Sequence, residues 1–326
     1  SRSGSAPFAF FDAWGLYAVL PLYTLHIVFL SFAVVRPRRR VVFTALFSAG
    51  AVFGLYEAYI TKVIWDPTWG EKGLAVGGVY LAQTAMLVLY WHPFMAFVVP
   101  LLAGELLLTS STETLDALPG FAARALRTRW MFPAAIFGAA FIGVSKPVNS
   151  PAPGHALASI LSSAAVPGLL TLLWLRAPGS GRRAGLTLRE LLPDGRQGLV
   201  AGLLLAAFYA ATGFLIRPGS MPRTIVPHLS VLALYALFCG LAAGVLDRSA
   251  RRDPAVPPGG AAPGRGRLAA ASAVFVVSLA AVSAALSPFE AAAGGFAMAA
   301  GLVGMAAGLA ITVAAVIGSW PRRRVR

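Results

Sequence analysis

Glu57 is the acidic residue of this chain that is best placed to bind a proton, an ion or a ligand. It lies within a long apolar segment, shortly before Thr61 and Lys62. A carboxylate in a membrane-spanning segment costs about 2.5–3.5 kcal/mol at the centre, so it usually faces protein or water and marks a proton, ion or ligand site. Thr61 lies one turn further along the same helical face. We expect Lys62 to extend to the outer membrane surface and to pair with Asp66. The alternative for Glu57 is a structural hydrogen bond to a tyrosine or glutamine of a neighbouring helix.

Four further polar residues lie at a comparable depth in the first and third apolar segments. His26 lies near the middle of the first segment, with Tyr23 one turn further out, and Tyr80 and Gln83 lie in the outer half of the third. We therefore predict a polar pocket that these residues line together with Glu57. This hypothesis rests on depth alone, because the sequence does not define the rotation of each helix.

His26 is also a candidate ligand for a haem or a pigment. A haem held by two histidines needs both at matching depth on facing helices. Here His26 is expected in mid-membrane, His92 at the inner edge, and His155 and His228 at the outer edge. The depths do not match, which leaves a single-histidine cofactor or a buried, hydrogen-bonded imidazole. The sequence identifies no particular cofactor.

Glu105 lies in an apolar stretch, 95–108, that is short and contains Pro100. Re-entrant segments occur only where protein or a water-filled cavity satisfies their backbone, so an acid there is consistent with a translocation path. If the stretch instead lies flat at the membrane surface, Glu105 is simply solvated. Both interpretations stay open.

Composition predicts the elements that carry these residues. Of the 326 residues, 58% are hydrophobic and only 12% are charged, against about 25% charged in soluble domains. The apolar runs are continuous and long enough for transmembrane helices, which need about 20 residues each. We predict an all-α polytopic helix bundle that forms a single transmembrane domain over residues 1–326.

The predicted bundle has about nine spans and one re-entrant or interfacial segment at 95–130. The spans are expected at 14–35, 41–65, 73–91, 131–145, 156–175, 198–216, 225–246, 268–286 and 291–318. The third is expected to end at His92-Pro93, since proline interrupts helices.

The net charge of +15 has a topological explanation, so we exclude nucleic acid as a partner. Most of the 27 basic residues fall in 36–40, 124–129, 176–197, 247–267 and the C-terminal tail. The positive-inside rule then predicts an external N-terminus and a cytoplasmic C-terminus, in a membrane that we take to be the bacterial cytoplasmic membrane.

The chain has no P-loop, no H-E-x-x-H, no G-x-S-x-G and no C-x-x-C motif, and we do not expect it to be an enzyme. The first hypothesis is a non-catalytic subunit of a larger membrane complex that scaffolds partner proteins and contacts lipid, quinone or pigment. The glycines of 291–318 are expected to pack within the protein, with an interface to a partner as the alternative. The second is a small-solute, ion or lipid transporter that uses Glu57 and the segment near Glu105. The third is an intramembrane enzyme on a lipid-linked substrate that uses Glu57, His26 and Lys62.

Overall fold

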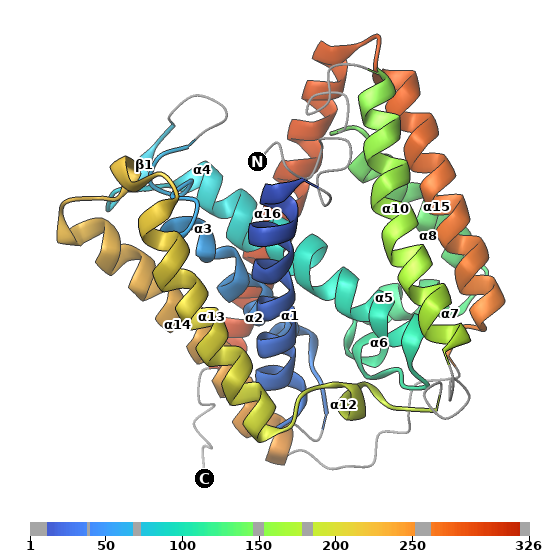
Figure 1. Ribbon diagram of the computed structural model, residues 1–326, viewed down its shortest axis with the longest axis horizontal. Coiled ribbons are helices and arrows are strands. Elements are labelled where there is room, and N and C mark those ends of the chain that lie inside the picture. Colours follow the sequence, from blue (N-terminus) through green and yellow to red (C-terminus); the bar gives the residue numbers. More distant parts are fainter. Residues whose placement is uncertain are drawn as a thin grey trace. The chain divides into compact units, whose positions relative to one another are not determined.

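The computed structural model describes residues 12–37, 40–67, 73–145, 153–177, 185–251 and 262–319 (Figure 1). Several basic residues that the sequence analysis placed in cytoplasmic loops lie outside these ranges, namely Arg38, Arg39, Arg182, Arg183, Arg252 and the arginines that follow Pro321.

The described chain is almost entirely helical, with one antiparallel pair of two-residue strands, β1 (Ala75–Val76) and β2 (Val79–Tyr80). The helices up to residue 108 are η2 (Gly15–Val19), α1 (Leu20–Val35), α2 (Phe43–Gly54), α3 (Tyr56–Tyr59), α4 (Leu81–Thr84), η3 (Ala85–Val98) and α5 (Val99–Leu108). Those that follow are α6 (Glu113–Ala117), α7 (Gly120–Arg127), α8 (Met131–Gly143), α10 (Pro153–Arg176), α12 (Leu188–Leu191), α13 (Gly195–Leu215), η4 (Pro218–Ser220), α14 (Ile225–Arg251), α15 (Arg265–Leu286) and α16 (Glu290–Ser319).

Seven helical stretches among the described residues are long and apolar enough to cross a membrane, which confirms the all-α polytopic fold. They are Gly15–Val35, Leu81–Leu108, Gly154–Arg176, Gly195–Leu215, Ile225–Gly244, Arg265–Leu286 and Ala291–Gly318. Two shorter apolar helices, α2 with 12 residues and α8 with 13, bring the total close to the nine expected.

The second expected span, 41–65, is not one long helix. Helix α2 ends at Gly54 and is followed by the single turn α3. Nine residues of α2 are buried, including Phe47 and Phe53. A helix that is apolar on all sides is typical of a protein core as well as of a lipid-exposed span, and hydropathy does not separate the two.

The expectation that the third span ends at His92-Pro93 is wrong. Residues 73–80 form the strand pair, and the helix then runs from Leu81 to Leu108 as α4, η3 and α5. Pro93 lies inside η3, which has the wider π-helical register. Such a register relaxes the constraint that proline places on an α-helix. The expected re-entrant segment is therefore the second half of this helix, followed by α6 and α7.

The chain divides into two compact units, while the single transmembrane domain expected from the sequence stays a prediction. The first unit comprises Ser1–Tyr23, Leu102–Leu191 and Pro257–Gly301, and the second comprises Thr24–Leu101, Leu192–Val256 and Leu302–Arg326. Hydropathy indicates which segments are apolar but not which of them pack together.

In the first unit, α8, α10 and α15 lie side by side (Figure 1) around Ala139, Ile160 and Leu279. Loops that the charge pattern assigned to one membrane side meet in this unit. Arg189 pairs with Glu113 at 2.6 Å, and the Arg267 guanidinium donates to the carbonyl of Thr128.

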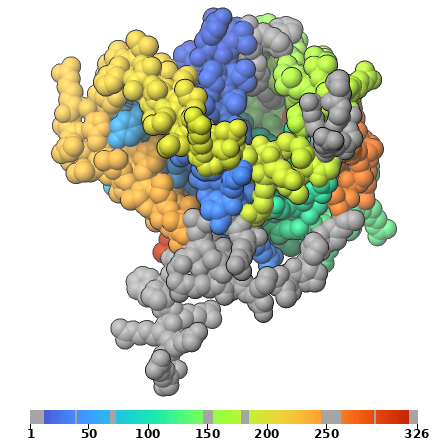
Figure 2. All heavy atoms as spheres, turned by 60° about the horizontal axis from the view of Figure 1, so that its bottom comes forward, coloured from blue at the N-terminus to red at the C-terminus, as the bar shows by residue number. Residues whose placement is uncertain are grey.

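In the second unit, α2 packs against both η3 and α14. One core cluster of this unit contains Phe47, Leu55 and Phe238. The outward faces of α13 and α14 carry exposed leucines such as Leu199 and Leu229, and side chains of these helices form much of the surface drawn in yellow to orange in Figure 2. In a membrane protein these apolar faces contact lipid.

Candidate functional site

The close approach of α2 to η3 depends on Gly50 and Gly54, which lie one turn apart on the same face of α2. A Cβ atom on Gly50 would lie 2.4 Å from the Cα of Pro93, and one on Gly54 would lie 2.8 Å from the carbonyl oxygen of Leu87. Only glycine permits backbones to come this close. The contact brings α3, which follows α2 directly, next to the middle of η3.

This contact places Glu57 of α3 beside His92 of η3. Both side chains are buried, with 6% and 0% of their surface exposed. The Nε2 atom of His92 lies 3.7 Å from Oε1 of Glu57. A small rotation of either side chain brings these two atoms within hydrogen-bonding distance.

The second ring nitrogen of His92 defines its tautomer. Nδ1 lies 3.0 Å from the carbonyl oxygen of Leu87. A carbonyl oxygen only accepts, so Nδ1 carries a proton and donates it. In the neutral imidazole, Nε2 is then an acceptor that faces the carboxyl group of Glu57. The pair is thus arranged to exchange one proton between Oε1 and Nε2.

Two hydroxyl groups hold the Glu57 carboxyl group. The Thr61 hydroxyl hydrogen-bonds both to Oε2 of Glu57 and to its main-chain carbonyl oxygen. The Tyr56 side chain forms a further hydrogen bond to the carboxyl group, and the Tyr56 ring meets His92 edge-on with centroids 5.2 Å apart. Thr61 therefore lies next to Glu57, as the sequence predicts, although α3 ends at Tyr59 and Thr61 follows the helix.

A second close helix contact, between α1 and α13, positions His26. A Cβ atom on Gly198 would meet the Phe32 ring at 2.4 Å, and one on Gly202 would meet the Phe29 ring at 2.8 Å. Further along α13 on the same face, the Tyr209 hydroxyl lies 2.9 Å from Nε2 of His26.

The His26 ring is enclosed by aromatic groups. It stacks on Phe53, with centroids 4.4 Å apart and planes inclined by 9°. Phe53 in turn lies 5.2 Å from the ring of His92. Because Nε2 already bonds Tyr209 and one ring face is covered, this arrangement favours a hydrogen-bonded histidine over a haem or pigment ligand.

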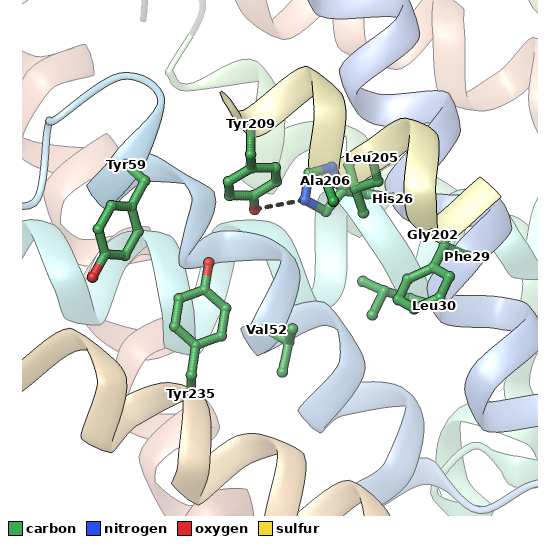
Figure 3. A pocket seen from close by; sticks show the side chains of 10 residues that line it. All are labelled: His26, Phe29, Leu30, Val52, Tyr59, Gly202, Leu205, Ala206, Tyr209 and Tyr235. Carbon is green, nitrogen blue, oxygen red and sulfur yellow. Dashed lines mark hydrogen bonds between the residues drawn. The ribbon is translucent and has the colours of Figure 1, made fainter. Parts of the chain in front are cut away.

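A cavity of about 360 Å³ opens between α1, α2, α3, α13 and α14 of the second unit (Figure 3). One part of its wall carries His26, Tyr59, Tyr209 and Tyr235, and the rest is formed by Phe29, Leu30, Val52, Gly202, Leu205 and Ala206. The hydroxyl groups of Tyr209 and Tyr235 point toward each other in Figure 3, and the Tyr209 hydroxyl forms its hydrogen bond with His26. Tyr209 bonds His26, which stacks on Phe53, and Phe53 contacts His92, so packed rings link the cavity wall to the Glu57–His92 pair.

Lys62 does not extend to the membrane surface as we expected. Its side chain is fully buried, and Nζ donates to the carbonyl oxygens of Ile60, Gly213 and Ile216. The last two belong to the C-terminal end of α13, where unpaired carbonyls attract a cation. Arg217, not Lys62, forms the close ion pair with Asp66, at 2.5 Å.

Lys62 and Arg217 both have positive φ, 60° and 46°. Such a backbone conformation is uncommon for residues other than glycine and persists only where surrounding contacts hold it. Here the contacts are reciprocal, because Lys62 binds the end of α13 while Arg217 donates to the carbonyl of Thr61 at 2.9 Å. This arrangement fixes the segment that follows Glu57.

We predict that Lys62→Met destabilises the protein by about 1–3 kcal/mol, because it leaves buried carbonyl oxygens at the end of α13 without a donor. Thermal unfolding of the purified protein in detergent measures this loss. Arg223→Met is the matched control, since Arg223 is an exposed cation in the same region. Equal unfolding temperatures for the two variants would contradict a structural role for the Lys62 ammonium group.

The other residues of the predicted pocket are less closely joined to it. Gln83 is buried in α4 with 7% of its surface exposed, and its Oε1 has no hydrogen-bond partner among the described residues. Tyr80 is partly buried, and its main-chain amide donates to Ile64 at 3.0 Å. Neither lines the cavity. Tyr23 is partly buried on α1 and belongs to the first unit.

Glu105 belongs to the first unit, and its contacts are those of a helix cap. Its side chain is fully buried, and Oε2 accepts the main-chain amides of Thr114 and Leu115 at 2.8 and 3.3 Å. Oε1 accepts from the Ser111 hydroxyl at 3.1 Å. Main-chain amides at the start of a helix are the usual partners of an acidic cap. These contacts favour a structural role that anchors α6.

A sequence model of an uncharacterized membrane protein family matches residues 2–326 of the chain. The chain belongs to this family. It is also 34% identical, over 242 residues, to an uncharacterized protein of Archaeoglobus fulgidus, and the match covers 73% of this chain and 72% of that protein. No solved structure matches the chain.

The sequence alone does not reveal that three residues, His92, Tyr209 and Tyr235, lie at the centre of the site. The sequence analysis expects His92 at the inner membrane edge, because it expects Pro93 to end the helix. Tyr209 and Tyr235 were not considered, although each is a polar aromatic residue in an apolar helix. The spacing Gly198-x-x-x-Gly202 was the available signal for the contact that places Tyr209.

Proposed function

We propose that this protein is a membrane transporter for a small solute or lipid, in which Glu57 binds and releases the coupling proton. The observation that carries the proposal is the buried Glu57–His92 pair, with Oε1 and Nε2 at 3.7 Å. An ionisable residue inside a membrane bundle is costly and commonly serves proton or ion movement. The pair lies next to a cavity large enough for a small ligand, since ligand sites commonly measure about 300–1,000 Å³.

The proton chemistry of the pair explains why a histidine accompanies the acid. With one proton between them, the pair is either a neutral acid and a neutral imidazole, or a carboxylate and an imidazolium. Interconversion of these forms moves charge over a short distance without exposing either group to lipid. A ligand that moves Tyr209 would also disturb His26 and, through the Phe53 ring, His92 beside Glu57. Such a link is what coupled transport requires.

Two contacts make the other hypotheses less favourable. An intramembrane enzyme that used Lys62 would need a free ammonium group, whereas Nζ is bound to three carbonyl oxygens.

A partner interface at Gly304 and Gly308 would need an open face. A Cβ on Gly304 would instead meet the Tyr90 ring at 2.2 Å, and one on Gly308 would meet the carbonyl oxygen of Leu89 at 1.9 Å. These glycines pack within the chain.

The subunit hypothesis remains testable by mass spectrometry of the protein purified gently from its native membrane. Partner proteins at stoichiometric amounts would favour a complex subunit. A protein accompanied only by membrane lipid is the result expected for an independent transporter.

Transport itself is tested in proteoliposomes that contain a trapped pH-sensitive dye. Pools of neutral lipid-soluble compounds and of polar metabolites are added outside, and the internal pH is followed. We expect at least one pool to drive proton movement that protein-free vesicles do not show. If no pool moves protons faster with the protein than without it, proton-coupled transport is refuted for those compounds.

We further propose that the chain lies in the cytoplasmic membrane with its N-terminus outside and its C-terminus in the cytoplasm. Within the second unit, Arg36 binds the carbonyls of Leu192 and Pro193 at 2.8 and 2.7 Å, so these two loops lie at one end, as the charge pattern requires. The positive-inside rule assigns this end to the cytoplasm.

A cysteine at position 185 tests this orientation. After Cys239 is replaced by serine, Gly185→Cys should resist an impermeant thiol reagent in intact cells and react once the cells are opened. Position 258, which is equally suited by charge, lies outside the described residues. Labelling of position 185 in intact cells would reverse the assignment.

A further inference from the structure

The cavity beside His26 has two chemically different parts. Four residues, His26, Tyr59, Tyr209 and Tyr235, bring hydrogen-bonding groups to one part. The remaining six lining residues are aliphatic, aromatic or glycine. A molecule that fills the cavity therefore meets a polar patch at one end and apolar contacts along the rest of its length.

The lining excludes a charged ligand. None of the ten lining residues is acidic, lysine or arginine. A ligand with a full charge would be buried without a counter-charge in the cavity wall, which is costly in an apolar environment.

The polar patch is suited to a carbonyl or hydroxyl group. His26 and Tyr209 share a hydrogen bond, and the Tyr235 hydroxyl points toward the Tyr209 hydroxyl from across the cavity (Figure 3). A phenol both donates and accepts hydrogen bonds, so the Tyr235 hydroxyl accommodates either a carbonyl oxygen or an alcohol. The Tyr59 hydroxyl points away from those of Tyr209 and Tyr235 in Figure 3, so the Tyr235 hydroxyl is the group that we expect to meet the ligand oxygen.

From these observations we propose that the cavity binds a neutral, lipid-soluble molecule with one terminal carbonyl or hydroxyl group, which rests its apolar body on Phe29, Val52 and Leu205. The inference rests on the proposed transport function, because it names the substrate class that function would serve. The bound carbonyl or hydroxyl group lies beside the Tyr209 hydroxyl, which bonds His26. Binding is non-covalent and requires no cofactor.

Photolabelling of the full chain in proteoliposomes tests the inference with benzophenone, which is a neutral, apolar ketone that inserts into nearby C–H bonds on illumination. We expect adducts concentrated on peptides of α1, α2, α13 and α14 that line the cavity. Excess of a neutral ketone, cyclohexanone coupled to a short alkyl chain, should compete. The negatively charged 4-benzoylbenzoate should not.

Two variants and one control locate the label. Tyr235→Phe keeps the ring but removes the hydroxyl, and should weaken labelling roughly three- to tenfold, as the loss of one hydrogen bond predicts. Val52→Trp fills the apolar part and should abolish the cavity adducts. Tyr80→Phe removes a phenol that does not line the cavity and should leave labelling unchanged.

The outcomes separate this inference from the transport proposal. Adducts spread over all lipid-exposed helices and insensitive to Val52→Trp would overturn the cavity assignment. Equal competition by 4-benzoylbenzoate would overturn the neutral class. Glu57→Gln should still be labelled, since Glu57 does not line the cavity, even though that variant is expected to lose proton movement. Labelled protein without any proton movement would leave the binding site established and refute the transport.

Discussion

Glu57→Gln is expected to reduce compound-driven proton movement in proteoliposomes to the level of protein-free vesicles. The amide keeps the size and shape of the carboxyl group and still accepts a hydrogen bond from Thr61, so the fold should lose less than about 1.5 kcal/mol. What it cannot do is bind and release a proton opposite Nε2 of His92. A large loss of function with little loss of stability is the signature of a protonation site.

The matched control is Glu105→Gln, because Glu105 is another buried glutamate in an apolar helix. Its carboxylate caps α6 through the amides of Thr114 and Leu115. We expect this variant to be less stable and to retain proton movement in the fraction that folds. If Glu105→Gln abolished proton movement while Glu57→Gln did not, the roles assigned to the two acids would be reversed.

Gly50→Ala is expected to destabilise the protein by about 1–3 kcal/mol and to impair proton movement as well. The added methyl group would lie 2.4 Å from the Cα of Pro93, which is main chain and cannot rotate away. Overpacking of this kind costs energy because helices must separate. Separation of α2 from η3 would also increase the distance between Glu57 and His92. Thermal unfolding in detergent and the flux assay measure the two effects.

Gly240→Ala provides the opposite result in the same unit. Gly240 lies inside α14, and a Cβ there would meet nothing within 4 Å. Replacing an open helical glycine by alanine stabilises a helix by roughly 0.5–1 kcal/mol. Gly50→Ala and Gly240→Ala should therefore shift the unfolding temperature in opposite directions. A Gly50→Ala variant as stable as wild type would show that α2 and η3 do not pack as described.

Much of the architecture is predictable from hydropathy, because the long lipid-exposed helices are apolar over their full length. The errors occurred where protein, not lipid, surrounds the helix. The 41–65 segment is apolar because α2 lies in the core of its unit. Pro93 does not end its helix, because the π-helical register of η3 tolerates it.

The candidate site was only partly predictable for a related reason. Glu57 and His26 stand out as polar residues in apolar segments, and both lie in the observed cluster. Depth along a helix does not determine which residues meet, however. The partners His92 and Tyr209 are set by glycine contacts, through Gly54 and Gly202, that fix the rotation of neighbouring helices. Lys62 was misassigned because its local sequence does not reveal the carbonyls at the distant end of α13.

Infrared difference spectroscopy of the protein in lipid tests the Glu57–His92 pair most directly. The carbonyl stretch of a protonated, buried carboxyl group is recorded while the pH is changed, for wild type, Glu57→Gln and Glu105→Gln. We predict a carboxyl band that titrates in wild type and in Glu105→Gln, accompanied by imidazole bands of His92, and that is missing in Glu57→Gln. A titrating band that persists in Glu57→Gln would contradict the assignment of Glu57 as the proton-binding residue.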